Sequence, residues 1–454
     1  MRELFDICTI IISFFFLVHS IKRILVSSRY LIYLLVFAFY ILPIYLDYFV
    51  GFQDHARYGF FVAMPDVATA CVYDVGLIIS SLIILFFRVP KQNLFYSNLQ
   101  MQKTNSQVRT YKFWLFVGMM LPTFFTVFLL RQPGMLYTFQ WRELELFNIG
   151  GSYSNVEKLT YFGISCAVML LTDKNGKMLS ITRLAALLFL FVNICIQGKR
   201  GIMFFAIINI VVNLLLIYVS LGKDKKARKL FGMVSVVVIA FFSVYMVVMS
   251  VVVKVEQRGY SEDDSNALYT STRIDFFRED RMRMAIFAEL HPERMTILEH
   301  KGQTIIPTVL SIVPLNYLAE YLDIPTPSYQ QFLSCANAGT KFNHAPHADN
   351  PNFMTVTIFA ELVSNFGIAF GIFFFSLLCV WFSKVIDRYT YPLNSFIICT
   401  FILLNLFNIP YLMLYAEIVL ILCVINKNRK RKQEKKTILY EGFDGRAITQ
   451  GSRG

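Results

Sequence analysis

Long runs of apolar residues without charges constrain this chain more than any other feature of its sequence. Residues 202–221 and 231–253 are two such runs, each long enough to cross a bilayer as a helix. The runs are solid rather than alternating, so they predict helices and not the strands of a membrane barrel. Only 16% of the residues are charged, where a soluble protein has about a quarter. We therefore expect an all-α fold, a polytopic transmembrane helical bundle.

The apolar runs predict about eleven membrane spans. The last two are short, and one tilted span broken at residues 408–410 is the alternative. The expected helices cover residues 4–20, 30–50, 65–87, 113–130, 156–172, 183–197, 201–221, 231–253, 354–383, 394–408 and 410–426.

Lysines and arginines lie mainly in alternate loops, and this bias orients the bundle. Basic loops stay in the cytoplasm, so the bias predicts an N-terminus outside and a cytoplasmic C-terminus. Eleven spans keep the basic tail inside, whereas ten would move it outside. The net charge of +13 is then a topology signal, and we expect no nucleic-acid partner.

The topology divides the chain into four parts. The longest outer segment, residues 254–353, is rich in Tyr, Phe, Leu and Ile, so it is not a disordered linker. We expect it to form short helices that pack on the membrane domain. Apolar spacing predicts one helix over residues 271–290. The parts are helices 1–8 in 1–253, an extracytoplasmic loop domain in 254–353, helices 9–11 in 354–426 and a basic tail in 427–454.

Arginines cluster on the predicted outer face. Arg278, Arg281 and Arg283 lie close together in the large loop, and Arg200 stands between glycines at a helix mouth. The guanidinium fork suits phosphate, so these arginines are candidate phosphate ligands. Local pairing with the interleaved acidic residues is the alternative, because such pairs are ordinary on helices.

Two histidines precede the ninth predicted span. His344 and His347 are candidate general bases, because imidazole accepts a proton near neutral pH. A capping turn that leads into the following helix is the alternative. A closed metal site needs three or four ligands, and the outer loops offer no matching pair, so we expect no metal and no cofactor.

Glu361 lies within an apolar run and is a candidate functional residue for that reason. It requires a cationic partner, and the outer arginines are candidates. Asp66 and Asp74 lie in or near the third span, and a late helix start would leave both of them shallow.

Several motifs occur in an order that resembles the Wzy-type O-antigen polymerases, which join oligosaccharide repeat units. The resemblance covers the stretch from Arg281 to Gly371 and one earlier turn. Its motifs are Gln197–Gly201, His291–Glu293, Lys301–Thr304, Ile312–Pro314 and Glu361–Gly367.

The resemblance implies a membrane glycosyltransferase that acts on the outer face of the bacterial cytoplasmic membrane. Donor and acceptor are glycans linked to undecaprenyl diphosphate, membrane lipids surround the protein, and a chain-length regulator protein is an expected partner. Arg200, Arg278, Arg281 and Arg283 would bind diphosphate, where arginine donors stabilise the departing charge. His344 or His347 would take the acceptor proton, with Glu361 as the orienting group.

Two other functions compete with polymerisation. An O-antigen ligase uses similar lipid-linked donors with a lipid A-core acceptor. A lipid-linked glycan flippase or a solute transporter would line a cavity within the spans with charge, whereas the charges here are predicted outside the spans.

Overall fold

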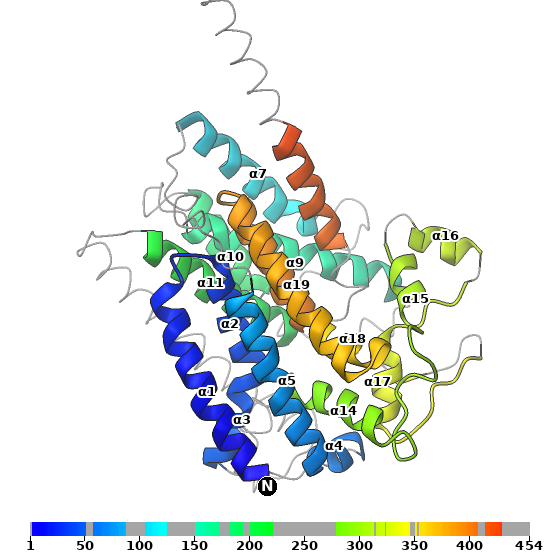
Figure 1. Cartoon of the computed structure of the whole chain (residues 1–454). Coiled ribbons are helices and arrows are strands. Elements are labelled where there is room, and N and C mark those ends of the chain that lie inside the picture. The colour runs from blue at the N-terminus through cyan, green and yellow to red at the C-terminus, as the bar shows by residue number, and fades with distance from the viewer. Residues whose placement is uncertain are drawn as a thin grey trace, which may run out of the picture.

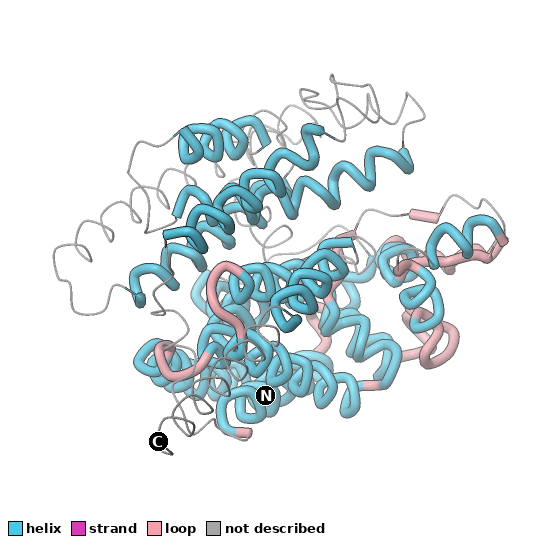
Figure 2. The backbone as a smooth tube through the Cα atoms, turned by 90° about the horizontal axis from the view of Figure 1, so that it is seen from above, coloured by secondary structure: helices cyan, strands magenta, loops and turns pink. Residues whose placement is uncertain are grey.

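The computed structural model describes residues 2–50, 58–87, 105–124, 150–172, 181–193, 200–220, 278–312, 315–322, 324–345, 350–351, 354–406 and 414–428. Within these ranges the regular structure is entirely helical, with no strand (Figure 2), which confirms the all-α prediction there. Four of the described helices are long and apolar enough to cross a membrane, and shorter apolar helices accompany them. The predicted eighth span, 231–253, lies outside the described residues.

The first group of helices begins with α1 (Arg2–Arg23), which is followed by a long helix interrupted by a π-helical turn. This long helix begins with α2 (Ser28–Val36), passes through the π-helical turn η1 (Phe37–Ile41) and continues as α3 (Leu42–Val50). Next come α4 (Tyr58–Ala63) and α5 (Val67–Phe86). α5 packs against α1, α2 and the later helix α19 (Ile368–Arg388). Figure 1 shows α1, α5 and α19 spanning the same body of the molecule.

A second group of helices packs beside the first. It contains α7 (Asn105–Phe124), α9 (Gly150–Thr172), α10 (Ile181–Phe191), α11 (Arg200–Ser220), α20 (Leu393–Leu406) and the helix over 414–428. Polar side chains cross-link the apolar surfaces: the hydroxyl of Ser165 accepts from Asn209 at 3.2 Å and from Tyr415 at 3.0 Å. Such bonds join helices where lipid offers no alternative partner.

Contacts between distant segments fix one end of the bundle. There, Arg2 donates to the backbone oxygen of Met64 at 3.3 Å, and the His291 ring lies 3.5 Å from the Asp66 carboxylate. This end carries the N-terminus, α4 and the helix α14 (Glu279–Leu290) (Figure 1). The N-terminus and the segment from residue 278 therefore share one face of the molecule.

The opposite end is fixed by the Asp387 carboxylate near the end of α19. It accepts from the Ser27 hydroxyl at 2.7 Å and from the Ser28 amide at 2.9 Å, which caps α2. The basic ends of α1 and α19 thus lie together. The helix over 414–428 also ends on this side (Figure 1), and Lys427 in its last turn adds positive charge.

The single helix expected over 354–383 is wrong. The chain forms α18 (Ile358–Phe366), turns at Gly367 and begins again as α19. Gly367 has a φ of 80°, which only glycine adopts at low cost. Glu361 therefore lies on a separate short helix before the span, rather than within the span.

The described part of the large loop holds four short helices. They are α14, α15 (Ile305–Leu310), α16 (Leu315–Tyr321) and α17 (Tyr329–Asn337). The helix expected over 271–290 begins at Glu279 in the structure, and residues 271–277 lie outside the described ranges. α14 packs against α4, α5 and α18, so this part of the loop lies against the membrane helices.

Candidate functional site

α14 is a charged helix that is buried around its circumference. Residues 278–287 are all buried, although five of the first six are charged. Unpaired charges cannot be buried cheaply, so each must find a partner within the protein. The acidic residues of α14 itself supply the ionic partners, and the surrounding segments add backbone acceptors.

Arg283 lies between α14 and α5. Its guanidinium lies 2.6 Å from Glu279 on the same helix and 5.1 Å from the centre of the Tyr73 ring. Asp74, which is fully buried, is a second acidic side chain nearby. Burial lowers the pKa of Arg283, but the carboxylates of Glu279 and Asp74 raise it to a value above the usual one, so the guanidinium stays charged. Its Nε and Nη1 atoms have no hydrogen-bond partner among the described residues.

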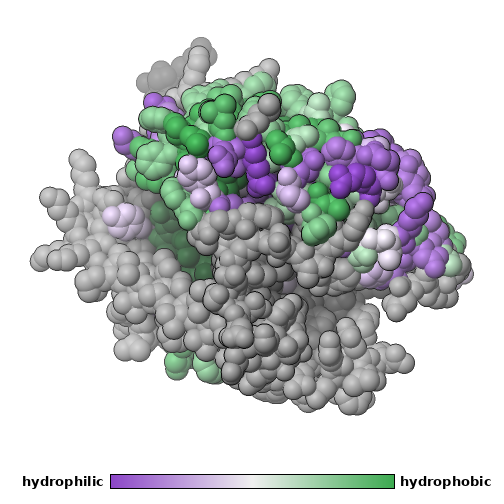
Figure 3. All heavy atoms as spheres, turned by 90° about the horizontal axis from the view of Figure 1, so that it is seen from below, coloured by the Kyte–Doolittle hydropathy of each residue, from purple (hydrophilic) through white to green (hydrophobic). Residues whose placement is uncertain are grey.

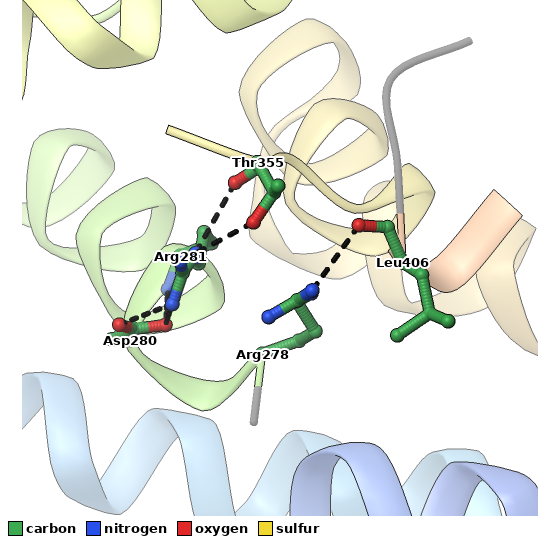
Figure 4. Close-up of polar contacts among 5 residues, drawn as sticks. All are labelled: Arg278, Asp280, Arg281, Thr355 and Leu406. Carbon is green, nitrogen blue, oxygen red and sulfur yellow. Dashed lines mark hydrogen bonds and ion pairs between the residues drawn. The ribbon is translucent and has the colours of Figure 1, made fainter. Parts of the chain in front are cut away.

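Arg281 points away from Arg283, toward the segment before α18. It pairs with Asp280 at 2.5 Å and donates to the backbone oxygen and hydroxyl of Thr355 at 3.2 and 3.3 Å (Figure 4). Two residues along a helix turn through about 200°, so Arg281 and Arg283 project to opposite sides of α14. The two arginines are therefore not brought together at one phosphate.

Arg278 precedes the first turn of α14 and points toward a third neighbour. Its guanidinium donates to the backbone oxygen of Leu406 at the end of α20, at 3.3 Å (Figure 4). Its amide donates to the backbone oxygen of Phe39 at 3.0 Å. Arg281 and Arg283 thus pair with acidic neighbours on the same helix, which is the alternative that the sequence left open. Arg278 instead binds a backbone oxygen.

The remaining expected phosphate ligand, Arg200, is the first residue of α11, and its side chain lies outside the described part. His347 also lies outside the described residues. His344 is exposed on the loop after α17. Its Nε2 lies 3.3 Å from the Glu299 carboxylate, and its ring contacts Phe332 and Phe342.

Glu361 lies under α15 and is 5% exposed. Its Oε1 accepts from the hydroxyl of Thr304 at 2.9 Å and from that of Thr308 at 3.4 Å, whereas Oε2 has no partner in the described ranges. Burial raises the pKa of this carboxyl to about 7, and the two hydroxyls offset part of the effect. The expected histidine or arginine partner is replaced by threonines.

A hydrogen-bond network holds the Glu361 side chain in place. Asn365, one turn later, donates to the Thr304 hydroxyl at 2.8 Å and accepts from the Thr304 amide at 3.3 Å. Lys301 pairs with Glu289 at the end of α14 and donates to the backbone oxygen of Ser364 at 3.3 Å. The motifs at residues 301–304 and 361–367 therefore meet in space, which their separation in sequence did not show.

Sequence reasoning missed the burial of Asp74. α5 begins at Val67 with Asp66 as its cap, yet Asp74 is fully buried rather than shallow, because α14 covers this part of α5. The signal that was available is an ionisable residue within an apolar run. Thr304 gave no comparable signal, since hydroxyls are common in loops.

Among the described residues, no group of three or more His, Cys, Asp or Glu side chains is placed to hold a metal ion. The site instead offers one buried carboxyl that titrates near neutral pH and three arginines with separate partners. Known protein families, curated proteins and solved structures give no match to this chain.

Proposed function

We propose that the chain is a membrane glycosyltransferase that polymerises oligosaccharide repeat units linked to undecaprenyl diphosphate. The proposal includes about eleven spans and a reaction site on the outer face of the bacterial cytoplasmic membrane. The acceptor hydroxyl attacks the anomeric carbon of the donor glycan, and the bond from that carbon to the lipid diphosphate breaks. The diphosphate leaves with the bonding electrons, and a base takes the acceptor proton.

The observation that carries this proposal is the Glu361 carboxyl. A base works best when its pKa lies near the operating pH, and burial brings the pKa of this carboxyl to about 7. Its Oε2 atom has no protein partner within the described ranges, which leaves one acceptor for a substrate hydroxyl. Access to this buried atom requires that α15 move aside. The family resemblance suggests the reaction class, and Glu361 is the candidate general base for that reaction.

The arginines have a different role in this proposal from the joint clamp that the sequence suggested. Because Arg278, Arg281 and Arg283 diverge, one of them at most meets a given diphosphate with its full fork. Arg281 donates to Thr355, which lies just before α18, the helix that carries Glu361. This contact connects Arg281 directly to the segment that leads to Glu361. A phosphate there would replace Asp280 as its anionic partner.

Glycan analysis in cells tests the proposal. Deletion of the gene should leave single repeat units, whereas loss of a ligase would accumulate long polymer on the lipid carrier. Glu361→Gln at normal protein level should lower chain extension by roughly a hundredfold or more, as expected for loss of a base. Glu3→Gln, an exposed carboxyl on α1, is the matched control. Wild-type chains from Glu361→Gln, with loss of chains from His344→Ala, would assign the base to the histidine instead.

A flippase or transporter is the second candidate, and one observation favours it. Asp74 and Arg283 are both buried between α5 and α14, so ionisable side chains do lie beside the spans, contrary to the sequence expectation. If the chain is a flippase, an inactive variant should retain lipid-linked single repeats on the cytoplasmic face of the membrane. Accessibility of these repeats to an impermeant periodic-acid reagent in intact cells separates the two functions.

A further inference from the structure

The exposed surface of the large loop changes sharply in chemistry at the start of α15. Before it, several exposed side chains are charged, among them Glu293, which is 66% exposed, and Lys301, which is 55% exposed. Over residues 305–324, the exposed side chains among those that the structure describes are large and apolar, namely Ile305, Ile306, Val309, Leu318, Tyr321, Leu322 and Ile324. Figure 3 shows hydrophilic residues gathered on the side of the molecule that carries this loop, beside hydrophobic ones.

α15 has two faces with different partners. Thr304 and Thr308, four residues apart, face Glu361. Ile306, which is 68% exposed, and Val309 project to the other side, three residues apart. The inner face is thus fixed by hydrogen bonds to α18, and the outer face is apolar and uncovered.

The position of these helices indicates what covers the outer face. In Figure 1, α15 and α16 lie above α18, at the height of α19, and not beyond α4 and α14 at the lower end of the bundle. The adjoining helices also expose aromatic side chains, with Phe366 at the end of α18 and Phe370 and Phe373 in α19. α19 is long and apolar enough to cross a membrane, so its exposed rings face lipid.

We propose that α15 and α16 lie in the membrane interface, with their apolar faces against the acyl chains of the bilayer. The apolar surface of the loop continues that of the lipid-facing helix, and it ends at the charged stretch before Thr304. Helices with one apolar and one polar side lie in the interface in this way, and Tyr321 provides an aromatic ring at its edge. In this arrangement α15, which lies over Glu361, is in contact with lipid. The proposal does not depend on the proposed reaction.

Tryptophan fluorescence in lipid nanodiscs tests the proposal. In a full-length background with Trp114, Trp141 and Trp381 replaced by Phe, one variant carries Ile306→Trp and a matched control carries Glu293→Trp. Both positions are exposed in the structure. Lipids brominated in the acyl chains should remove most of the emission at position 306 and little at position 293, whereas aqueous iodide should do the reverse.

Two outcomes would overturn the proposal. Quenching of position 306 by iodide, as strong as at position 293, would place α15 in water. Emission at position 306 that neither agent quenches would show a protein cover, either a second copy of the chain or another protein. Val309→Trp repeats the measurement at a second exposed position, and size-exclusion chromatography selects folded protein for both variants.

Discussion

Glu361 combines an unusual protonation equilibrium with a fixed position. Burial favours its neutral form, so the folded protein holds this proton up to about pH 7 while the unfolded chain releases it near the usual value of 4.5. The folded state therefore binds more protons between these values, and stability falls as the pH rises through that window. At higher pH the buried carboxylate costs on the order of 3 kcal/mol.

Glu361→Gln should remove this dependence, because an amide does not titrate. Thermal unfolding of the variant and the wild type should agree best near pH 5, and the variant should become the more stable of the two toward pH 8. Parallel unfolding temperatures across that range would show that the carboxyl has an ordinary pKa in the folded protein.

Arg283 and Glu279 form a buried pair, with both side chains 1% exposed. Glu279→Gln or Arg283→Met each leaves an uncompensated charge and should cost about 3–5 kcal/mol of stability. The double variant leaves neither charge, so its cost should be clearly smaller than the sum of the two single costs. Chemical denaturation in detergent measures all three, and additive costs would contradict the pairing.

At the scale of elements, the turn between α18 and α19 decides where Glu361 lies. Gly367 allows the positive φ, and Gly371 allows the first turn of α19 to approach α18 closely. A Cβ atom on Gly371 would lie 2.5 Å from the Val363 Cα, and a backbone atom cannot move aside as a side chain does. The bend therefore depends on glycine at both positions.

Gly371→Ala should destabilise the protein by about 1–3 kcal/mol, the usual cost of overpacking. Gly76→Ala is the matched control, since a Cβ there meets only the end of the flexible Ile372 side chain, at 2.7 Å. We expect a smaller loss for the control in thermal unfolding. Equal losses would mean that the α18–α19 contact is no tighter than the α5–α19 contact.

At the scale of the whole molecule, contacts between distant segments define two ends of the bundle. Arg2, Asp66 and His291 lie at one end, while the basic ends of α1 and α19 lie at the other. Basic helix ends favour the cytoplasmic side, so the loop with α14 to α17 should face outward.

Cysteine labelling measures this orientation. In a background without the eight native cysteines, Lys301→Cys should react with an impermeant maleimide in intact cells, and Lys427→Cys only after permeabilisation. Both residues are exposed in the structure. Reaction of Lys301→Cys in permeabilised cells alone would place the loop in the cytoplasm and end the proposed mechanism.

The sequence by itself determined the helical class, the apolar helices and the candidate residues, because apolar runs and charged residue types are local properties of the chain. The tertiary structure alone decided which charges meet. It placed Asp74 under α14, gave Glu361 threonine partners 57 and 53 residues earlier in the chain, and sent Arg278, Arg281 and Arg283 to three different neighbours. Burial and partner choice depend on how distant segments pack, and that packing sets the protonation of Glu361.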